Sequence, residues 1–340
     1  MAQGAREVVS RRRLKILFTG FERFWMQVAR DGLASRCADE LDVSWIEWPS
    51  TFSERVRFII RVLRSDLVIR MGMPFEFESE TNRFFLWLSV VLPVFHPVNY
   101  WIGDEAEVFL ANGGLSGLSE RDRRAIDQMS HLAVTEHIAE EMSAAGVPTG
   151  NAELMGPERD YPDVIPPLPE QLRVLSYWGD TRFDYFSGPA VFAAARALPD
   201  VQFDVLGTTG EVFENVPDNV RFHGQVADVI SYMTRSTVLV RVIRFDALPS
   251  SMVEEAMLLG RHFIYSLDWP ATIKVDYGDS VGLIAALRGL KESSEAGTLE
   301  LNMEGREFTL VDSDPDAQAE IMREEFLRVH SEWRARRSRA

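Results

Sequence analysis

The residues best suited to chemistry lie in one stretch, 240–266, where a short apolar run leads into a polar loop and then a helix. The loop contains Asp246, and we expect the helix to begin at Ser250 or Ser251. The first amides of a helix have no partner within it and lie at the positive end of its dipole, so this junction suits a diphosphate. Glu255, one turn into the helix, could accept hydrogen bonds from a ribose diol. The stretch is therefore suited to holding a nucleotide.

The spacing of Ser251 and Glu254 is that of a capping box, in which each side chain bonds an amide of the first helical turn. This spacing predicts a structural role for Glu254, and it leaves Glu255 facing elsewhere and available to a ligand. Phosphate oxygens also need positive charge, and arginine can bind them through two parallel hydrogen bonds. Arg241 and Arg244 flank the end of the preceding apolar run and are candidates for that role.

The elements that must position these residues alternate along the chain. Predicted strands in the first half lie at 14–18, 43–47, 67–70, 98–102 and 132–135, with helices near 25–40 and 53–63. A second series has strands at 173–177, 202–206, 220–222, 238–242 and 263–265, with helices near 189–197, 226–234 and 252–259. Alternation of this kind predicts parallel sheets covered by helices on both faces, with ligands at the carboxyl ends of the strands.

Between the two series the periodicity stops in a proline-rich stretch that reads as a stiff linker. We predict an N-terminal Rossmann-like domain over 14–150, the linker over 151–171, and a C-terminal nucleotide-binding domain over 172–315. A charged amphipathic helix and a basic tail follow over 316–340. Two doubly wound α/β domains joined in this way are expected to face each other across a cleft.

The 240–266 stretch resembles the donor-binding motif of the retaining glycosyltransferases of family four, which have the two-Rossmann GT-B fold. That motif has an acidic residue, a spacer, a Glu followed by Ala-Met or Ala-Leu, and a later Gly. Its second half is matched by Glu255, Ala256, Met257 and Gly260. The resemblance implies that Glu255 binds the donor ribose.

The loop is most similar to a bacterial branch with an Arg on the preceding strand and an Asp-Gly-Leu-Ser loop. Arg241, Asp246 and Leu248 fit that pattern, whereas Ala247 and Pro249 replace its Gly and Ser. Asp246 stands one residue farther from Glu255 than the family spacing requires. Either the loop carries an extra residue, or Ala247 occupies the first acidic position. In the family this first acid lies near the transferred sugar, which implies a catalytic role for Asp246.

The resemblance is good from about 172 to 270 and looser in the first half, where Gly20 ends the leading strand on the acceptor side. Many relatives bind the diphosphate with an Arg and a Lys-Gly pair. This chain lacks the pair, but Arg182 and Gly188 lie in the corresponding region, and a solvated Arg182 is the alternative. Gly207 opens a Gly-x-x-Gly turn that could approach the base or ribose, although such turns are common in loops. Asp104 could orient the acceptor hydroxyl or simply cap a turn.

The resemblance implies a hexosyltransferase that moves a sugar from a nucleotide-sugar donor to an acceptor hydroxyl, with retention of configuration. Neither a metal nor a cofactor is expected, because the histidines show no metal-ligand spacing. The acceptor could be a glycan, a lipid-linked sugar or a small molecule in bacterial glycan or glycoconjugate biosynthesis. One alternative is a sugar-nucleotide epimerase or hydrolase on the same fold. The other is a non-catalytic binding or scaffold protein, and the departure of the loop from the family pattern is the feature that allows it.

Composition narrows the partners and the compartment. A net charge of −16 and a pI near 4.9 argue against nucleic acid, whose phosphates such a chain repels. The single cysteine and the lack of a signal-peptide pattern predict a cytoplasmic protein. The apolar segment 84–95 is shorter than the roughly 20 residues that span a bilayer, so we favour a buried helix over a membrane-docking surface. Weak peripheral contact with the inner face of the membrane stays a minor hypothesis, based on the basic ends of the chain: Arg11, Arg12, Arg13, Arg334, Arg336, Arg337 and Arg339.

Overall fold

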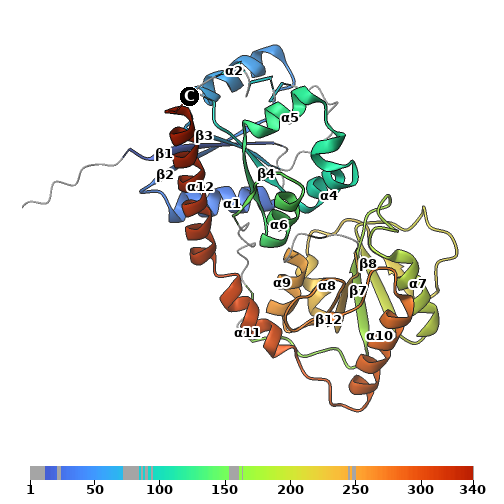
Figure 1. The fold of residues 1–340 in the computed structure, drawn as a ribbon. Coiled ribbons are helices and arrows are strands. Elements are labelled where there is room, and N and C mark those ends of the chain that lie inside the picture. The colour runs from blue at the N-terminus through green and yellow to red at the C-terminus, as the bar shows by residue number, and fades with distance from the viewer. Residues whose placement is uncertain are drawn as a thin grey trace, which may run out of the picture. The chain divides into compact units, whose positions relative to one another are not determined.

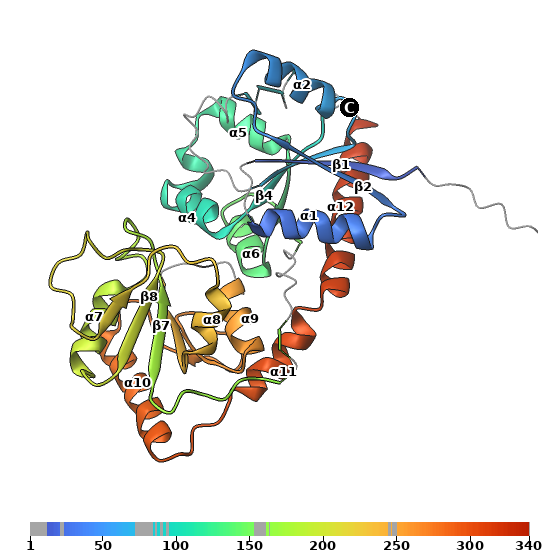
Figure 2. The same cartoon turned by 180° about the vertical axis from the view of Figure 1, so that it is seen from behind.

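The computed structural model describes residues 12–20, 24–71, 84–85, 87–88, 91–92, 95–152, 161–162, 164–243, 246 and 250–339. The chain divides into two compact units (Figures 1 and 2). Unit 1 combines Met1–Glu158 with Pro315–Ala340, and unit 2 is Arg159–Asp314. The C-terminal helix therefore belongs to the same unit as the first half of the chain. The domain limits at 150, 171 and 315 stay predictions.

Unit 1 contains a six-stranded sheet in the order β2-β1-β3-β4-β5-β6, and all of its strand pairs are parallel. Its first strand is an almost continuous apolar run that is buried along most of its length, as parallel strands covered on both faces must be. The strands are β1 (Leu14–Gly20), β2 (Leu41–Glu47), β3 (Leu67–Met71), β4 (Pro97–Trp101), β5 (Ser130–Ala133) and β6 (Gly150–Asn151).

The helices of unit 1 begin where the sequence supplies capping groups. Thr51 forms a capping box with Glu54 at the start of the second helix, and Ser119 and Thr135 each accept an amide hydrogen bond at the start of a later one. The helices are α1 (Phe24–Arg36), α2 (Phe52–Val62), α4 (Gly103–Ala111), α5 (Glu120–Asp127), α6 (Glu136–Ala144) and α12 (Pro315–Arg337), with a 3-10 turn at Gly114–Gly117.

Helix α12 packs against α1, as both views of the fold show (Figures 1 and 2). Its buried Phe326 meets Phe18 of β1 edge-on, with ring centroids 6.0 Å apart. Arg36 pairs with Asp316 at 2.6 Å, and Arg323 pairs with Glu40 at 2.9 Å. Apolar packing and these ion pairs together hold the end of the chain on unit 1.

Unit 2 contains a second six-stranded sheet in the order β12-β11-β10-β7-β8-β9, also parallel throughout. The strands are β7 (Arg173–Tyr177), β8 (Gln202–Leu206), β9 (Val220–Phe222), β10 (Val238–Arg241), β11 (His262–Tyr265) and β12 (Ile273–Lys274). The helices are α7 (Gly188–Ala197), α8 (Val229–Thr234), α9 (Ser251–Leu258), α10 (Ser280–Glu295) and α11 (Met303–Asp312).

Alternate residues of the unit 2 strands face two separate apolar clusters. Val174 and Val240 lie in the cluster that includes residues of α7 and α10, whereas Leu175 and Leu239 lie in the cluster that includes residues of α8 and α9. The sheet is thus covered on both faces, which confirms the predicted doubly wound α/β fold of both halves. In each sheet the strand order reverses beside the first strand, between β1 and β3 in unit 1 and between β7 and β10 in unit 2. Such reversal points are where doubly wound sheets bind ligands.

Candidate functional site

The end of β10, at the reversal point of the unit 2 sheet, carries the most tightly organised polar cluster of the predicted site. Arg241 donates from Nε to Oδ2 of Asp246 at 2.6 Å and from Nη2 to Oδ1 at 3.0 Å, a bidentate ion pair. Tyr265 is the register partner of Arg241 on β11, and its hydroxyl donates to the same Oδ2 at 2.7 Å. The Arg241 and Asp246 side chains are 15% and 10% exposed, so this carboxylate is held between two donors in a partly dry site.

The electrostatics of the cluster favour the charged pair with a neutral phenol. Burial lowers the pKa of Arg241, but the charge and hydrogen bonds of Asp246 outweigh it and leave that pKa above its ordinary value. Burial and then the Asp246 carboxylate raise the pKa of Tyr265 well above its ordinary value. Tyr265 therefore keeps its proton and acts as a donor at neutral pH.

Aromatic packing holds Arg241 from the other side. Its guanidinium lies 5.0 Å from the ring centroid of Phe186, in the connection between β7 and α7. The ring of Phe186 in turn packs edge-on against two tyrosine rings. Its centroid lies 5.2 Å from that of Tyr185 and 6.4 Å from that of Tyr177, the last residue of β7. The Arg241 guanidinium and the Phe186 ring thereby connect the end of β10 with the end of the neighbouring strand β7.

The β7–α7 connection also contains Arg182 and Gly188. Arg182 is exposed, and its guanidinium lies 5.3 Å from the ring centroid of Tyr185. A Cβ on Gly188 would stand 2.1 Å from the ring of Phe183, so packing alone requires a glycine there. These contacts place Arg182 on the connection that contacts Arg241, but they leave the predicted phosphate-binding role of both residues untested.

Gly207 follows β8 with a φ of 94°, a left-handed conformation, and its amide donates to the carbonyl of Gly224 at 2.8 Å. A Cβ at this position would stand 2.7 Å from the carbonyl oxygen of Trp178, just after β7. The hydroxyl of the next residue, Thr208, donates to Asp180 in that same connection. The loops after β7, β8 and β9 are thus tied together at the carboxyl edge of the sheet.

Helix α9 begins one residue earlier than the predicted capping box requires. Ser250 is the N-cap, and its side chain makes no capping hydrogen bond. With this start the third helical position is Val253, which has no carboxylate, so the predicted box of Ser251 with Glu254 is wrong. Glu254 has a different structural role, because it accepts a 2.5 Å hydrogen bond from the Ser313 hydroxyl at the end of α11. Glu254 and Glu255 are each 6% exposed in the first turns of α9, where the helix dipole stabilises negative charge.

The other predicted site residues divide between the first sheet and positions outside the described structure. Gly20 ends β1 beside Met71 of β3, at the reversal point of the unit 1 sheet. Arg244, Leu248 and the side chain of Asp104 lie outside the described residues. Residues 247 and 249 are not described either, so the loop register between Asp246 and Glu255 stays open.

Sequence reasoning missed Tyr265 and Phe186, because strand-end and loop aromatics resemble ordinary core residues. It also missed a buried polar row in unit 1. Thr19, Arg70, Asn99 and His131 are successive register partners across β1, β3, β4 and β5, and the Arg70 guanidinium donates to Asn99 Oδ1 at 3.1 Å. A single charged residue within an apolar strand, as at Arg70, is the one signal that could have identified this row.

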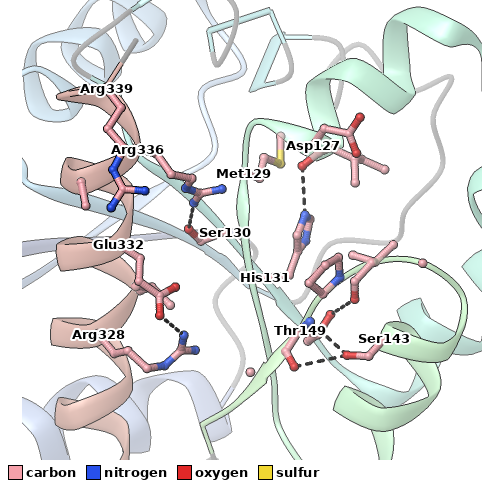
Figure 3. Close-up of a pocket in the computed structure, with 17 residues that line it drawn as sticks. Asp127, Met129, Ser130, His131, Ser143, Thr149, Arg328, Glu332, Arg336 and Arg339 are labelled. Carbon is pink, nitrogen blue, oxygen red and sulfur yellow. Dashed lines mark hydrogen bonds and ion pairs between the residues drawn. The ribbon is translucent and has the colours of Figure 1, made fainter.

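A cavity of about 770 Å³ lies elsewhere in unit 1, at the amino-terminal edge of β5 and β6 beside α12 (Figure 3). Arg336 of α12 donates a hydrogen bond to the Ser130 hydroxyl at 3.2 Å. Arg328 and Glu332, both on the α12 side of the cavity, form an ion pair at 2.8 Å. None of the predicted site residues lines this cavity. Its lining shares no residue with the cluster at the carboxyl edge of the unit 2 sheet.

Within the described ranges, no group of three or more His, Cys, Asp and Glu side chains could hold a metal ion. No helix among those same residues is long and apolar enough to cross a membrane.

Neither a protein-family model nor a curated protein sequence matches the chain. Among solved structures, HepE of Anabaena in complex with UDP and glucose is similar, with a TM-score of 0.64 and 12% identity over 92% of this chain and 99% of that one. A glycosyltransferase from Rickettsia africae matches with a TM-score of 0.60 and 10% identity over 94% of this chain and 98% of that one. TarM matches with a TM-score of 0.58 and 12% identity over 78% of this chain and 54% of that one. At these identities the likeness establishes the fold, which is the GT-B fold that the sequence predicts.

Proposed function

We propose that the chain is a glycosyltransferase whose unit 2 binds a nucleotide-sugar donor at the β10–α9 junction. The observation that carries the proposal is the buried Arg241–Asp246–Tyr265 cluster at the reversal point of the sheet, followed by a helix that carries Glu255 in its first turns. The fold is shared with HepE, whose structure was solved with UDP-glucose. The family-four resemblance of the same stretch supports this choice of ligand.

Each residue has a separate task in the proposed donor site. Glu255 accepts hydrogen bonds from the ribose, and the first amides of α9, at Ser251 and its neighbours, bind the diphosphate. Arg182, Arg241 and Arg244 supply positive charge around the phosphates. Gly188, Gly207, Leu248 and Ser250 shape the backbone that approaches the donor.

In the transfer step, the bond between the anomeric carbon and the diphosphate breaks and the diphosphate leaves with the electron pair. Hydrogen-bond donors of the protein that already point at the leaving diphosphate stabilise its developing negative charge, and this is commonly the largest contribution to the rate. The acceptor hydroxyl forms the new bond to the anomeric carbon, and its proton passes to an oxygen of the departing diphosphate. Asp246 lies near the transferred sugar in this proposal, held in place by Arg241 and Tyr265. Asp104 and Gly20 serve the acceptor, configuration is retained, and no metal takes part.

Release of the nucleoside diphosphate tests the proposal directly. Wild-type protein is mixed with UDP-, GDP-, ADP- and dTDP-sugars, with and without a pool of glycan, lipid-linked and small-molecule acceptors. We expect one class of donor to release its diphosphate faster when acceptors are present. Equal release without any acceptor would identify a hydrolase, and conversion of the sugar without release would identify an epimerase. Binding without turnover would leave a non-catalytic nucleotide-sugar-binding protein.

A further inference from the structure

Helix α2 in unit 1 has two apolar faces rather than one. Phe58 and Val62 are buried in the core of the unit. A second set on another face of the helix follows the spacing of successive helical turns and is exposed to solvent: Phe52 by 83%, Val56 by 42%, Ile60 by 44% and the adjoining Leu63 by 51%. One apolar stripe is enough to attach a surface helix to its domain. Folding of unit 1 therefore accounts for the first face and not for the second.

Positive charge borders this exposed stripe. Arg57, Arg61 and Arg64 are exposed on the adjacent side of the helix, and none of them pairs with an acidic side chain among the described residues. The one acidic residue of the helix, Glu54, is bound to its start, where its carboxylate accepts from the amides of Ser50 and Thr51 at 3.0 and 2.9 Å. The exposed part of α2 is thus apolar in the middle and cationic at one side.

Neighbouring segments extend the same surface at both sides of the helix. Beyond Leu63, a hollow of about 540 Å³ is lined by Arg334 and Arg337, and also by Arg12, which pairs with Asp66 of the same lining at 3.0 Å. Both views of the fold place this end of α12 beside α2 (Figures 1 and 2). At the other side, the guanidinium of Arg55 lies 5.8 Å from the ring centroid of Phe84. The ring of Phe84 stacks on that of Trp87, with the ring centroids 6.0 Å apart, and Trp87 is 45% exposed. Tryptophan side chains are enriched at the interface between a membrane and water.

We propose that this surface, composed of the exposed stripe of α2 with Arg57, Arg61 and Arg64, docks on a bilayer that contains anionic lipids. A helix with a broad apolar face bordered by cations lies in the plane of the interface, with its apolar side chains among the acyl chains and its cations at the phosphates. The chain as a whole carries a charge of −16, so an anionic membrane would repel it except where arginines are concentrated.

A second copy of the chain is a poorer occupant of the same surface. In a two-fold symmetric dimer the same patch meets itself, which would bring the arginine rows of two α2 helices together. Like charges at an interface oppose association. The docking surface lies on unit 1 and includes none of the proposed donor-binding residues, so it stands or fails independently of the proposed function.

Flotation of the full-length chain with lipid vesicles tests the proposal. We expect binding to vesicles that mix phosphatidylcholine with phosphatidylglycerol, little binding to phosphatidylcholine alone, and weaker binding as salt increases. The double variants Phe52→Ser/Ile60→Ser and Arg57→Gln/Arg61→Gln should each weaken vesicle binding by about tenfold or more. Their thermal midpoints should stay at the wild-type value, because the altered side chains are exposed.

Matched control variants separate this surface from general effects of composition. Val281→Ser/Val311→Ser removes two valines that are 76% and 79% exposed on unit 2, and Arg221→Gln/Arg288→Gln removes two exposed arginines there. Both controls should bind vesicles as wild type does. The proposal is overturned if wild type floats with neither kind of vesicle, or if the controls lose as much binding as the α2 variants. Self-association of wild type that Phe52→Ser abolishes, without vesicle binding, would assign the surface to a dimer instead.

Discussion

At the scale of single residues, the ion pair of Arg241 with Asp246 is the interaction on which the proposed donor site depends. Asp246→Asn removes the charge that compensates a largely buried guanidinium, so we expect a loss of about 3 kcal/mol in the free energy of unfolding. Tyr265→Phe deletes only a neutral donor to the same carboxylate and should cost less, about 1.5 kcal/mol. Urea unfolding of the two variants beside wild type measures both. Equal losses, or a negligible loss for Asp246→Asn, would contradict this description of the cluster.

Two buried histidines of unit 1 make its stability depend on pH. Burial lowers the pKa of His131 to about 4 and that of His96 to about 2, so the folded state keeps both rings neutral. An unfolded histidine has a pKa near 6.5, so below that pH the unfolded chain binds more protons than the folded one. Stability is therefore fully present above about pH 6.5 and falls as the pH drops toward 4, by up to about 1.4 kcal/mol per pH unit for each histidine.

The variant His131→Gln checks that pH dependence. It should unfold at lower urea concentration than wild type at pH 7, because the Gln side chain does not reproduce the hydrogen bonds of the ring to Trp101 and Ile126. Its loss of stability between pH 6.5 and pH 4 should be shallower than that of wild type, since one of the titrating rings is gone. An unchanged slope would mean that His131 does not contribute to the acid sensitivity.

The individual site residues were only partly predictable from the sequence. Arg241 and Asp246 could be selected because a charged residue at a strand end and an acid in the next loop form a recognisable pattern. Tyr265 could not be selected from the sequence, because its hydrogen bond to Asp246 depends on the pairing of β11 with β10. The buried Arg70–Asn99 contact likewise depends on sheet register, which one sequence does not determine.

At the scale of elements, the loop after β8 is fixed by its glycine. Gly207→Ala would force a side chain into a left-handed conformation and against the Trp178 carbonyl, so we expect a loss of about 1–3 kcal/mol. Gly289 lies inside α10, and no atom beyond its own helical turn and chain neighbours stands within 4 Å of the place that a Cβ would occupy, so Gly289→Ala should instead stabilise the protein by about 0.5–1 kcal/mol. Thermal unfolding compares the two. A harmless Gly207→Ala would show that the loop can relax away from β7.

Alternation of apolar runs with helical stretches was enough to locate five of the six strands described in each sheet. The start of α9 was less predictable, because Ser250 and Ser251 are both good N-caps in isolation. A tertiary contact that the sequence does not reveal also involves this turn: Glu254 accepts a hydrogen bond from Ser313, far along the chain. Short strands such as β6 and β12 were missed because two residues carry no periodicity.

At the scale of the whole molecule, the fold could be predicted because it depends on the order of elements rather than on any one contact. The association of α12 with unit 1 could not, since its partners Arg36 and Phe18 lie at the other end of the sequence. The donor, the acceptor and the loop register near Asp246 depend on a few pocket contacts, and a shared fold does not supply those.

The central claim is that unit 2 holds a nucleotide sugar through Glu255 at the start of α9. The most direct measurement is thermal shift with UDP-, GDP-, ADP- and dTDP-sugars on wild type, Glu255→Ala and the control Glu211→Ala, an exposed glutamate of the same unit. One donor class at a hundred times its dissociation constant should stabilise wild type and the control by about 2.7 kcal/mol. It should stabilise Glu255→Ala far less, because losing hydrogen bonds to a carboxylate weakens binding by about tenfold to a hundredfold. A shift that Glu255→Ala leaves intact, or no shift with any donor, would contradict the claim.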